Sequence, residues 1–232
     1  DYKNFSKFKE KIIYLIYDSE PNEIEEVNNS DTENEKSTKY ILNAIYRENG
    51  QRNFITEGLK HANDDDLILI SDVDEIPNLK ETNLKNFKEK LFFFNQEMFY
   101  YKFNLKLPNH NWVGTRSCKK KYLKSPQWLR NIKTKKRPFW KFFKDKEPQL
   151  IEDGGWHFSF LKEPASIKKK IISYSHQEFN KEEFIDEKKI KLKIERGKDL
   201  FNRNMKYKVI AVDESFPEYI VKNKDLFKDW II

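Results

Sequence analysis

The sequence predicts an α/β protein whose sheet is mostly parallel and flanked by helices. Short, continuous apolar runs alternate along the chain with segments in which apolar residues recur at helical spacing, as in layered α/β folds. The chain has 232 residues, of which 38% are hydrophobic and 15% aromatic, and this is enough to form one substantial core. We therefore expect a single domain over residues 1–232.

Strands are predicted from the apolar runs. Residues 11–17 are rich in β-branched and aromatic side chains and indicate a buried strand. Residues 67–71 form a continuous apolar run, which is typical of strands covered on both faces. The segment 98–107 is rich in Phe and Tyr, and residues 156–161 and 209–212 form short apolar runs. Each of these is expected to be a strand.

Helices are predicted between the strands. Apolar residues recur at helical spacing over residues 41–62, where an Asn-Gly pair at 49–50 predicts a break. One-faced or amphipathic patterns predict further helices near residues 84–91, 167–172 and 182–196. Strand and helix therefore alternate through most of the chain.

Composition limits the compartment. A single cysteine, Cys118, cannot form an intramolecular disulfide or a Cys-based zinc site, so a reducing compartment is expected. No apolar run approaches the roughly 20 residues that span a bilayer, and there is no secretory signal pattern. The chain begins with Asp1 rather than Met, which leaves room for a leader or anchor upstream. We expect a cytoplasmic protein, with peripheral membrane association as the alternative.

Positive charge is concentrated in one segment. Residues 116–146 contain thirteen Lys or Arg and one acid, Asp145, although the whole chain has a net charge of only +7. An anionic membrane surface or an acidic glycan is the expected partner of this segment, and a solvated loop is the alternative for most of its lysines. Basic residues interleaved with aromatics also suit single-stranded nucleic acid, but no nucleic-acid partner is expected.

The expectation of no nucleic-acid partner comes from the acidic sequence Asp72-Val73-Asp74, which nucleic-acid binding leaves unexplained. Ligands of open α/β sheets gather at the carboxyl ends of strands, where these residues lie. Carboxylates at this position suit Mn²⁺ or Mg²⁺, and such a cation neutralises the charge of a departing nucleoside diphosphate. Asp-x-Asp alone is a weak signal, because acidic turns commonly follow strands.

Several separate motifs occur in order along the chain. They are QRNFITEGLKHANDDDLILISDVDEIPNL at 51–79, YYKFN at 100–104, WVGT at 112–115, DGGWHFSF at 153–160 and SYSHQEFN at 173–180. Together they resemble glycosyltransferase family 17 from about residue 11 to the C-terminus. That family includes the enzyme that adds the bisecting N-acetylglucosamine to the β-linked mannose of N-glycans, and it has bacterial and viral members.

The resemblance implies a GT-A-type fold, a nucleotide-sugar donor, a glycan acceptor, a divalent metal and inversion at the anomeric carbon. UDP-N-acetylglucosamine is the donor of the best-known members. Members usually begin with an additional strand, helix and strand, and this chain starts at what resembles the end of that region. We therefore expect this chain to lack the N-terminal strand-helix-strand. We also expect the protein to act in the cytoplasm of a bacterium or of a virus-infected host cell.

The resemblance also suggests metal ligands. Asp74 is expected to bind the metal directly, and Asp72 to contact the ribose, or the metal through water. His157 and His176 lie inside matched motifs, and imidazole suits Mn²⁺ as a third ligand. A late histidine often completes the metal site of GT-A enzymes, which favours His176. The alternative for either histidine is a hydrogen-bonded core residue.

Four further residues are expected at the nucleotide sugar. Arg52 and Asn53 would approach the diphosphate or base, where an arginine fork suits phosphate. The alternative for these two residues is a solvated helix face paired with Glu48. Arg130 lies in a Leu-Arg pair that resembles a family element and would contact the diphosphate. Trp156 would stack on a sugar ring or fill the core.

An inverting transfer also needs a carboxylate that takes the proton from the acceptor hydroxyl. Asp153 is the expected base, because Gly154 and Gly155 after it leave space for the acceptor. The alternative is that Asp153 initiates a turn. For Glu75 a structural role, as a cap or ion pair that steadies its turn, is the alternative to a place in the site.

Three other classes of function stay open. The first is a basic nucleic-acid-binding protein, which would show salt-sensitive binding to oligonucleotides. The second is a metal-dependent phosphohydrolase or nuclease, which would release nucleoside diphosphate without any need for an acceptor. The third is a noncatalytic homologue that binds the sugar nucleotide but does not turn it over.

Overall fold

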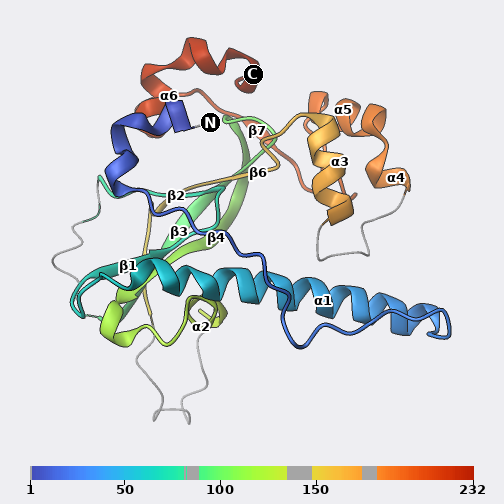
Figure 1. The fold of residues 1–232 in the computed structure, drawn as a ribbon. Helices are drawn as coiled ribbons and strands as arrows, with labels where there is room; N and C mark the ends of the chain where they lie inside the picture. The colour runs from blue at the N-terminus through green and yellow to red at the C-terminus, as the bar shows by residue number, and fades with distance from the viewer. Residues whose placement is uncertain (1, 81, 83–88, 135–147, 174–181) are drawn as a thin grey trace, which may run out of the picture.

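The computed structural model of the chain describes residues 2–80, 82, 89–134, 148–173 and 182–232. A strongly twisted sheet occupies the centre, helices α1 and α2 lie at one end of it, helices α3 to α5 form a group beside it, and α6 lies at the other end (Figure 1). None of the helices in these described ranges is both long and apolar enough to cross a lipid bilayer.

Seven strands in the described ranges form one open sheet with the order β1-β4-β3-β6-β2, to which β5 adds on β3 and β7 on β4. The strands are β1 (Leu67–Ile70), β2 (Glu75–Pro77), β3 (Leu91–Tyr100), β4 (Leu105–Lys119), β5 (Gln149–Ile151), β6 (Gly155–Ser159) and β7 (Lys208–Val209). The α/β class predicted from the sequence is confirmed.

The predicted mostly parallel sheet is wrong, because most strand pairs are antiparallel. Among the described residues, only the pairs β3/β5 and β3/β6 are parallel. The reason is local: β3 and β4 are joined by the short turn at residues 101–104, where Tyr101 has a φ of 63°, so they form a hairpin without a crossover helix. Their apolar runs resemble parallel strands because other elements cover both faces of the sheet.

The helices are α1 (Glu33–Phe54), α2 (Pro126–Asn131), α3 (Pro164–Ser173), α4 (Glu182–Ile185), α5 (Glu187–Glu195) and α6 (Glu218–Lys222). Short 3-10 segments are η1 (Tyr2–Lys11), η2 (Ile55–Leu59), η4 (Lys120–Tyr122) and η7 (Lys224–Trp230). Helix α1 begins with a capping box between Thr32 and Glu35. The predicted break at residues 49–50 is wrong, since α1 continues to Phe54.

Other element predictions have mixed outcomes. The helix predicted at 167–172 is confirmed as part of α3, and the one at 182–196 is divided at Asp186, the N-cap of α5. The helix predicted near 84–91 falls largely on residues 83–88, which lie outside the described ranges, and Leu91 begins β3.

The buried strand predicted at residues 11–17 is wrong. Residues 12–17 form neither helix nor strand, and Ile13, Tyr14 and Ile16 are largely exposed. Alternate residues turn inward instead: the Tyr17 ring lies 5.5 Å from that of Phe54 on α1. This continuous apolar run therefore packs partly against a helix and does not join the sheet.

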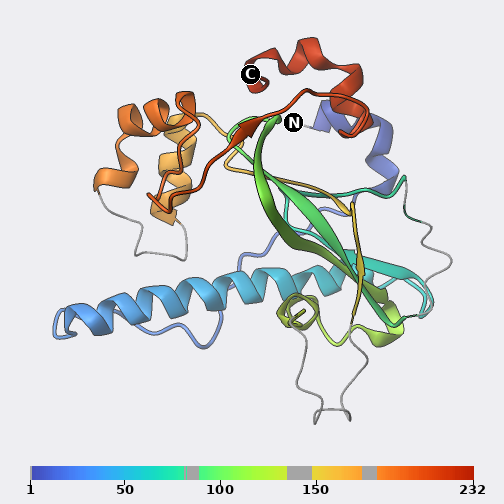
Figure 2. The same ribbon diagram turned by 180° about the vertical axis from the view of Figure 1, so that it is seen from behind.

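Three core clusters cover the sheet. One, around Met98, Tyr100 and Ile167, lies under α3 and α5, and a second, around Phe99, Trp156 and Phe216, lies under the C-terminal segment. The third, around Phe93 and Leu129, joins the sheet to α2. Seen from behind, the C-terminal segment passes along β7 and back over the end of the sheet (Figure 2). The two faces of β3 and β6 are therefore covered by different parts of the chain.

Candidate functional site

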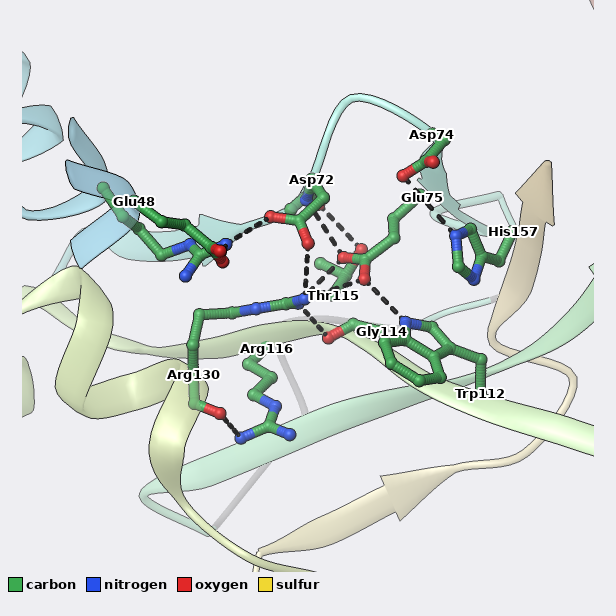
Figure 3. A network of polar contacts seen from close by, with 12 residues as sticks. Glu48, Asp72, Asp74, Glu75, Trp112, Gly114, Thr115, Arg116, Arg130 and His157 are labelled. Carbon is green, nitrogen blue, oxygen red and sulfur yellow. Dashed lines mark hydrogen bonds and ion pairs between the residues drawn. The ribbon is translucent and has the colours of Figure 1, made fainter. Parts of the chain in front are cut away.

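The acidic motif forms a tight turn between two strands. After β1 the chain passes through Ser71 and Asp72, exposes Val73 completely, and enters β2 at Glu75. The backbone N–H of Glu75 donates to the carbonyl of Asp72 at 3.0 Å and closes the turn. The Ser71 and Thr115 hydroxyls lie 2.7 Å apart and tie the turn to β4. The two aspartates therefore occupy a fixed turn, with side chains that point apart (Figure 3).

Glu75 holds the turn from inside the protein. It is 4% exposed, and its carboxylate accepts from Arg130 Nη1 at 2.8 Å and Nη2 at 2.9 Å, and from Trp112 Nε1 at 2.7 Å. It also accepts from the backbone N–H of Asp72 at 3.0 Å. This confirms the structural role considered for Glu75 from the sequence. Its charge is compensated by a two-pronged arginine contact, which a buried carboxylate requires.

Two arginines hold Asp72. Arg130 Nη2 donates to its carboxylate at 2.9 Å and Arg52 Nη2 at 3.1 Å, while Arg52 also pairs with Glu48 at 2.9 Å. The Arg52 and Arg130 side chains are only 13% and 9% exposed, so neither lies on a solvated helix face. Charges of neighbouring carboxylates outweigh the effect of burial and raise the pKa of Arg130. The predicted donor-site residues Arg52, Asp72 and Arg130 are thus brought together.

The position of Arg130 is set by α2. The side chain of Asn53, predicted at the donor, accepts from the Gln127 backbone N–H at 3.0 Å near the start of this helix. At its other end, Arg116 donates to the carbonyl of Arg130 (Figure 3) and to those of Leu129 and Ile132. Burial lowers the pKa of Arg116 to about 10. Asn53 therefore contacts α2, and the structure shows no bond between it and Asp72.

Asp74 faces a different set of groups. Its carboxylate lies 3.5 Å from His157 Nε2 and 3.5 Å from Lys170 Nζ on α3, and its side chain is 22% exposed. Burial raises the pKa of Asp74, but the hydrogen bond and charge of His157 and the charge of Lys170 outweigh it, so the pKa lies below its ordinary value. His157 also packs on Trp112 and approaches Met98 Sδ at 3.0 Å.

The donor set near Asp74 fits a divalent cation in part. A carboxylate and an imidazole are accepted ligands of Mn²⁺ or Mg²⁺-like ions, and Asp74 and His157 already lie side by side. Asp72 instead faces two guanidinium groups, which fits a carboxylate that acts through water or on a ribose. In the described ranges no three His, Cys, Asp or Glu side chains form a group that could hold a metal by themselves. His176 lies outside these ranges.

Asp153 and Trp156 belong to the other face of the sheet. Glu75 pairs with His157, and Ile76 pairs with Trp156, so consecutive side chains of β2 and β6 alternate between faces. Trp156 is 9% exposed and donates from Nε1 to the Ser215 carbonyl at 3.1 Å. A cavity of about 750 Å³ on this face is lined by Ile76, Asp153, Trp156, Phe216 and Tyr219, among others.

The glycines of the matched motifs serve close backbone approach. Gly155 has a φ of 122°, and a Cβ there would overlap the Ile76 carbonyl of the neighbouring strand. A Cβ on Gly154 would lie 2.7 Å from the Asn95 backbone nitrogen, and one on Gly114 would overlap the Gln96 side chain. These positions therefore explain why glycine occurs beside Asp153, without any need for an acceptor at that turn.

Several charges in the described part of the basic segment pair with groups of the protein itself. Lys119 and Lys121 donate to Asp65 at 2.7 and 2.8 Å, and these bonds lower the pKa of Asp65 to about 2. Arg116 and Arg130 are engaged around α2. Residues 135–147, which carry much of the remaining charge, lie outside the described ranges. An anionic partner for this segment stays a prediction.

Comparison with protein families gives the class of the chain. The family model described as Glycosyltransferase family 17 matches residues 1–228. The chain belongs to glycosyltransferase family 17. Comparison with curated proteins and with solved structures found no match. The family assignment makes the chain a glycosyltransferase, with a sugar donor and a glycan acceptor as its general substrates.

In this family 17 glycosyltransferase, most residues of the polar network around the acidic turn had been singled out from the sequence. Arg52, Asp72, Arg130 and Glu75 converge as one network, and His157 accompanies Asp74. Sequence reasoning missed Lys170, which looked like one lysine among three on an amphipathic helix. The only available signal was its place on the helix that follows the DGGWHFSF motif.

Proposed function

We propose that the chain transfers a sugar from a nucleotide-sugar donor to a glycan hydroxyl with the help of a divalent cation, on a GT-A-type fold. N-acetylglucosamine, carried by UDP, is the proposed sugar. The single observation that supports this site is the rigid turn after β1, which presents Asp74 and Asp72 in different directions, each next to groups of suitable chemistry. The family assignment supplies the reaction type.

In this proposal Asp74 and His157 hold Mn²⁺ or Mg²⁺, with His176 as a further candidate ligand. A cation held there would supply positive charge that offsets the negative charge developing on the departing diphosphate. Asp72, fixed by Arg52 and Arg130, accepts a hydrogen bond from the ribose or orients a water molecule. Its two arginines hold the carboxylate in place, which preorganises the site before the donor binds.

The base that takes the acceptor proton stays a prediction. Asp153 is exposed and lines the cavity on the opposite face from Glu75 and His157. For Asp153 to act as the base, the acceptor must bind in that cavity. Its hydroxyl must also reach past the edge strand β2 to the sugar donor on the side of Asp74. Asp153→Asn tests this directly: loss of transfer with retained donor binding supports the assignment, and full activity removes it.

The donor proposal is tested by thermal unfolding with a panel of sugar nucleotides, each with and without MnCl₂. A ligand that binds only the native protein raises the melting temperature. We expect UDP-N-acetylglucosamine to stabilise the wild type only when Mn²⁺ is present, and Asp74→Ala to remove this effect.

The matched control is Asp213→Ala, an exposed aspartate that bonds locally to Ser215, and it should keep the full stabilisation. Equal stabilisation of the wild type and Asp74→Ala would place the cation elsewhere. Donor binding without turnover across a range of glycan acceptors would favour the noncatalytic homologue. Release of nucleoside diphosphate at the same rate with and without acceptor would favour a hydrolase.

A further inference from the structure

A second buried polar group is centred on Asp199. Asp199 is only 5% exposed, although it carries a charge. Its carboxylate accepts from Arg203 Nη2 at 2.6 Å, from Arg203 Nε at 3.2 Å and from the Tyr207 hydroxyl at 3.2 Å. The backbone N–H groups of Phe201 and Arg203 donate to the same carboxylate at 3.1 and 2.8 Å. The Asp199 carboxylate therefore accepts hydrogen bonds from two side chains and two backbone N–H groups.

A continuous set of contacts links this group to Asp74. Lys170 Nζ lies 3.5 Å from Asp74 and 4.9 Å from the centre of the Phe160 ring. The Phe160 and Tyr100 rings are stacked, with centroids 6.4 Å apart and planes at 18°. The Tyr100 ring also lies 5.1 Å from that of Tyr207, whose hydroxyl donates to Asp199. A chain of packed rings therefore connects Lys170, beside Asp74, to Asp199 and its partner Arg203.

The arrangement orients a guanidinium group that still reaches solvent. The Arg203 side chain is 38% exposed, whereas the Asp199 side chain is 3% exposed. The Phe201 ring supports the guanidinium from one side, with 5.1 Å between Cζ and the ring centroid. Burying a carboxylate costs free energy, and it needs compensation by several good hydrogen bonds. Stability alone does not require a charged pair here, so positioning of Arg203 is the more specific explanation.

We propose that Arg203, oriented by Asp199, and Lys170 form a phosphate-binding pair that contacts the diphosphate of the sugar donor beside Asp74. This inference rests on the proposed function. Arginine binds phosphate oxygens through two parallel N–H groups, and lysine adds a compact charge. Fixed cationic groups of this kind stabilise the negative charge that develops on a leaving diphosphate. Arg52 and Arg130 lie instead on the side of Asp72, to whose carboxylate both donate.

The test is calorimetric titration with inorganic pyrophosphate, UDP and uridine, each in the presence of MnCl₂. Arg203→Gln should weaken pyrophosphate and UDP binding about 10-fold or more, as expected for a lost charge-assisted hydrogen bond, and leave uridine binding unchanged. Arg196→Gln removes the same charge from a neighbouring exposed position and should change each affinity less than about twofold. Unchanged pyrophosphate affinity in folded Arg203→Gln would overturn the inference.

Additional variants keep the test decisive if Arg203→Gln does not fold. Arg203→Lys retains a partner for Asp199, and Lys170→Gln changes only the helix α3 side; each should lower pyrophosphate affinity at least threefold. Unchanged affinity in both overturns the inference. If the wild type binds pyrophosphate through Asp74 while the Arg203 variants bind equally well, only this inference fails. If the wild type binds neither pyrophosphate nor any nucleoside diphosphate, the proposed function fails and this inference with it.

Discussion

Replacing Glu75 with Gln isolates the contribution of the buried carboxylate to the acidic turn. The carboxylate accepts four hydrogen bonds, two from Arg130, one from Trp112 and one from the Asp72 backbone. A glutamine offers one acceptor oxygen and turns its NH₂ toward groups that are themselves donors. It also leaves the charge of Arg130, whose side chain is 9% exposed, with Asp72 as its remaining carboxylate partner.

Breaking a buried ion pair by removing one partner costs about 3–5 kcal/mol. For a chain of this length each kcal/mol lowers Tm by about 2–4 °C, so Glu75→Gln should lower Tm by roughly 6–20 °C. The matched control is Glu97→Gln, which removes a carboxylate that pairs with Lys106 while 34% exposed. An exposed pair contributes less than about 1 kcal/mol, so its Tm should change by a few degrees at most.

Differential scanning calorimetry on both variants provides the measurement, with urea unfolding as a second probe of the free energy. A Tm loss in Glu75→Gln no larger than that in Glu97→Gln would refute the reasoning, because it would mean that the turn does not depend on the buried carboxylate. Retained MnCl₂-dependent donor binding in a destabilised Glu75→Gln would separate its structural role from a direct role at the ligand.

Three further outcomes are expected. Gly155→Ala should lower the free energy of unfolding measured in urea by about 3 kcal/mol or more, because Gly155 has a positive φ and the new Cβ would overlap the Ile76 carbonyl. A smaller loss than in Gly197→Ala, whose new Cβ would lie 3.8 Å from the Leu105 side chain, would contradict this. Burial raises the pKa of Cys118 to about 11, so native protein at pH 8 should react with a thiol reagent far more slowly than urea-unfolded protein; equal rates would contradict its burial. Asp186→Ala should cost about 1 kcal/mol in thermal unfolding, because it removes the N-cap of α5.

The fold could be predicted from sequence as far as local pattern determines it. The run at 67–70 is a strand, and the apolar spacing at 167–172 is helical, as expected. Pairing direction could not be predicted, because the turn at 101–104 depends on Tyr101 taking a left-handed φ, and aromatic residues rarely do so. The apolar run at 11–17 also misleads, because a run of β-branched and aromatic residues can lie against a helix without joining the sheet.

The candidate site could be predicted where a motif places residues on one turn. Asp72, Asp74 and Glu75 are neighbours in sequence, and their turn follows directly from the end of β1. The partners of these acids come from distant segments, and no local pattern distinguishes Lys170 from other helix lysines. Strand geometry places Trp156 and His157 on opposite faces of β6, but only the register between β2 and β6 shows which of the two lies on the same face as Glu75.

The position of the short helix α2 determines where Arg130 meets the acidic turn. It has six residues and is therefore about 9 Å long, with Asn53 bonded near one end and Arg116 at the other. A tilt of about 10° around one end would displace the other by about 1.5 Å, which exceeds the tolerance of a hydrogen bond. Substitutions of Asn53 or Arg116 should therefore shift α2, misplace the Arg130 side chain and disturb Asp72.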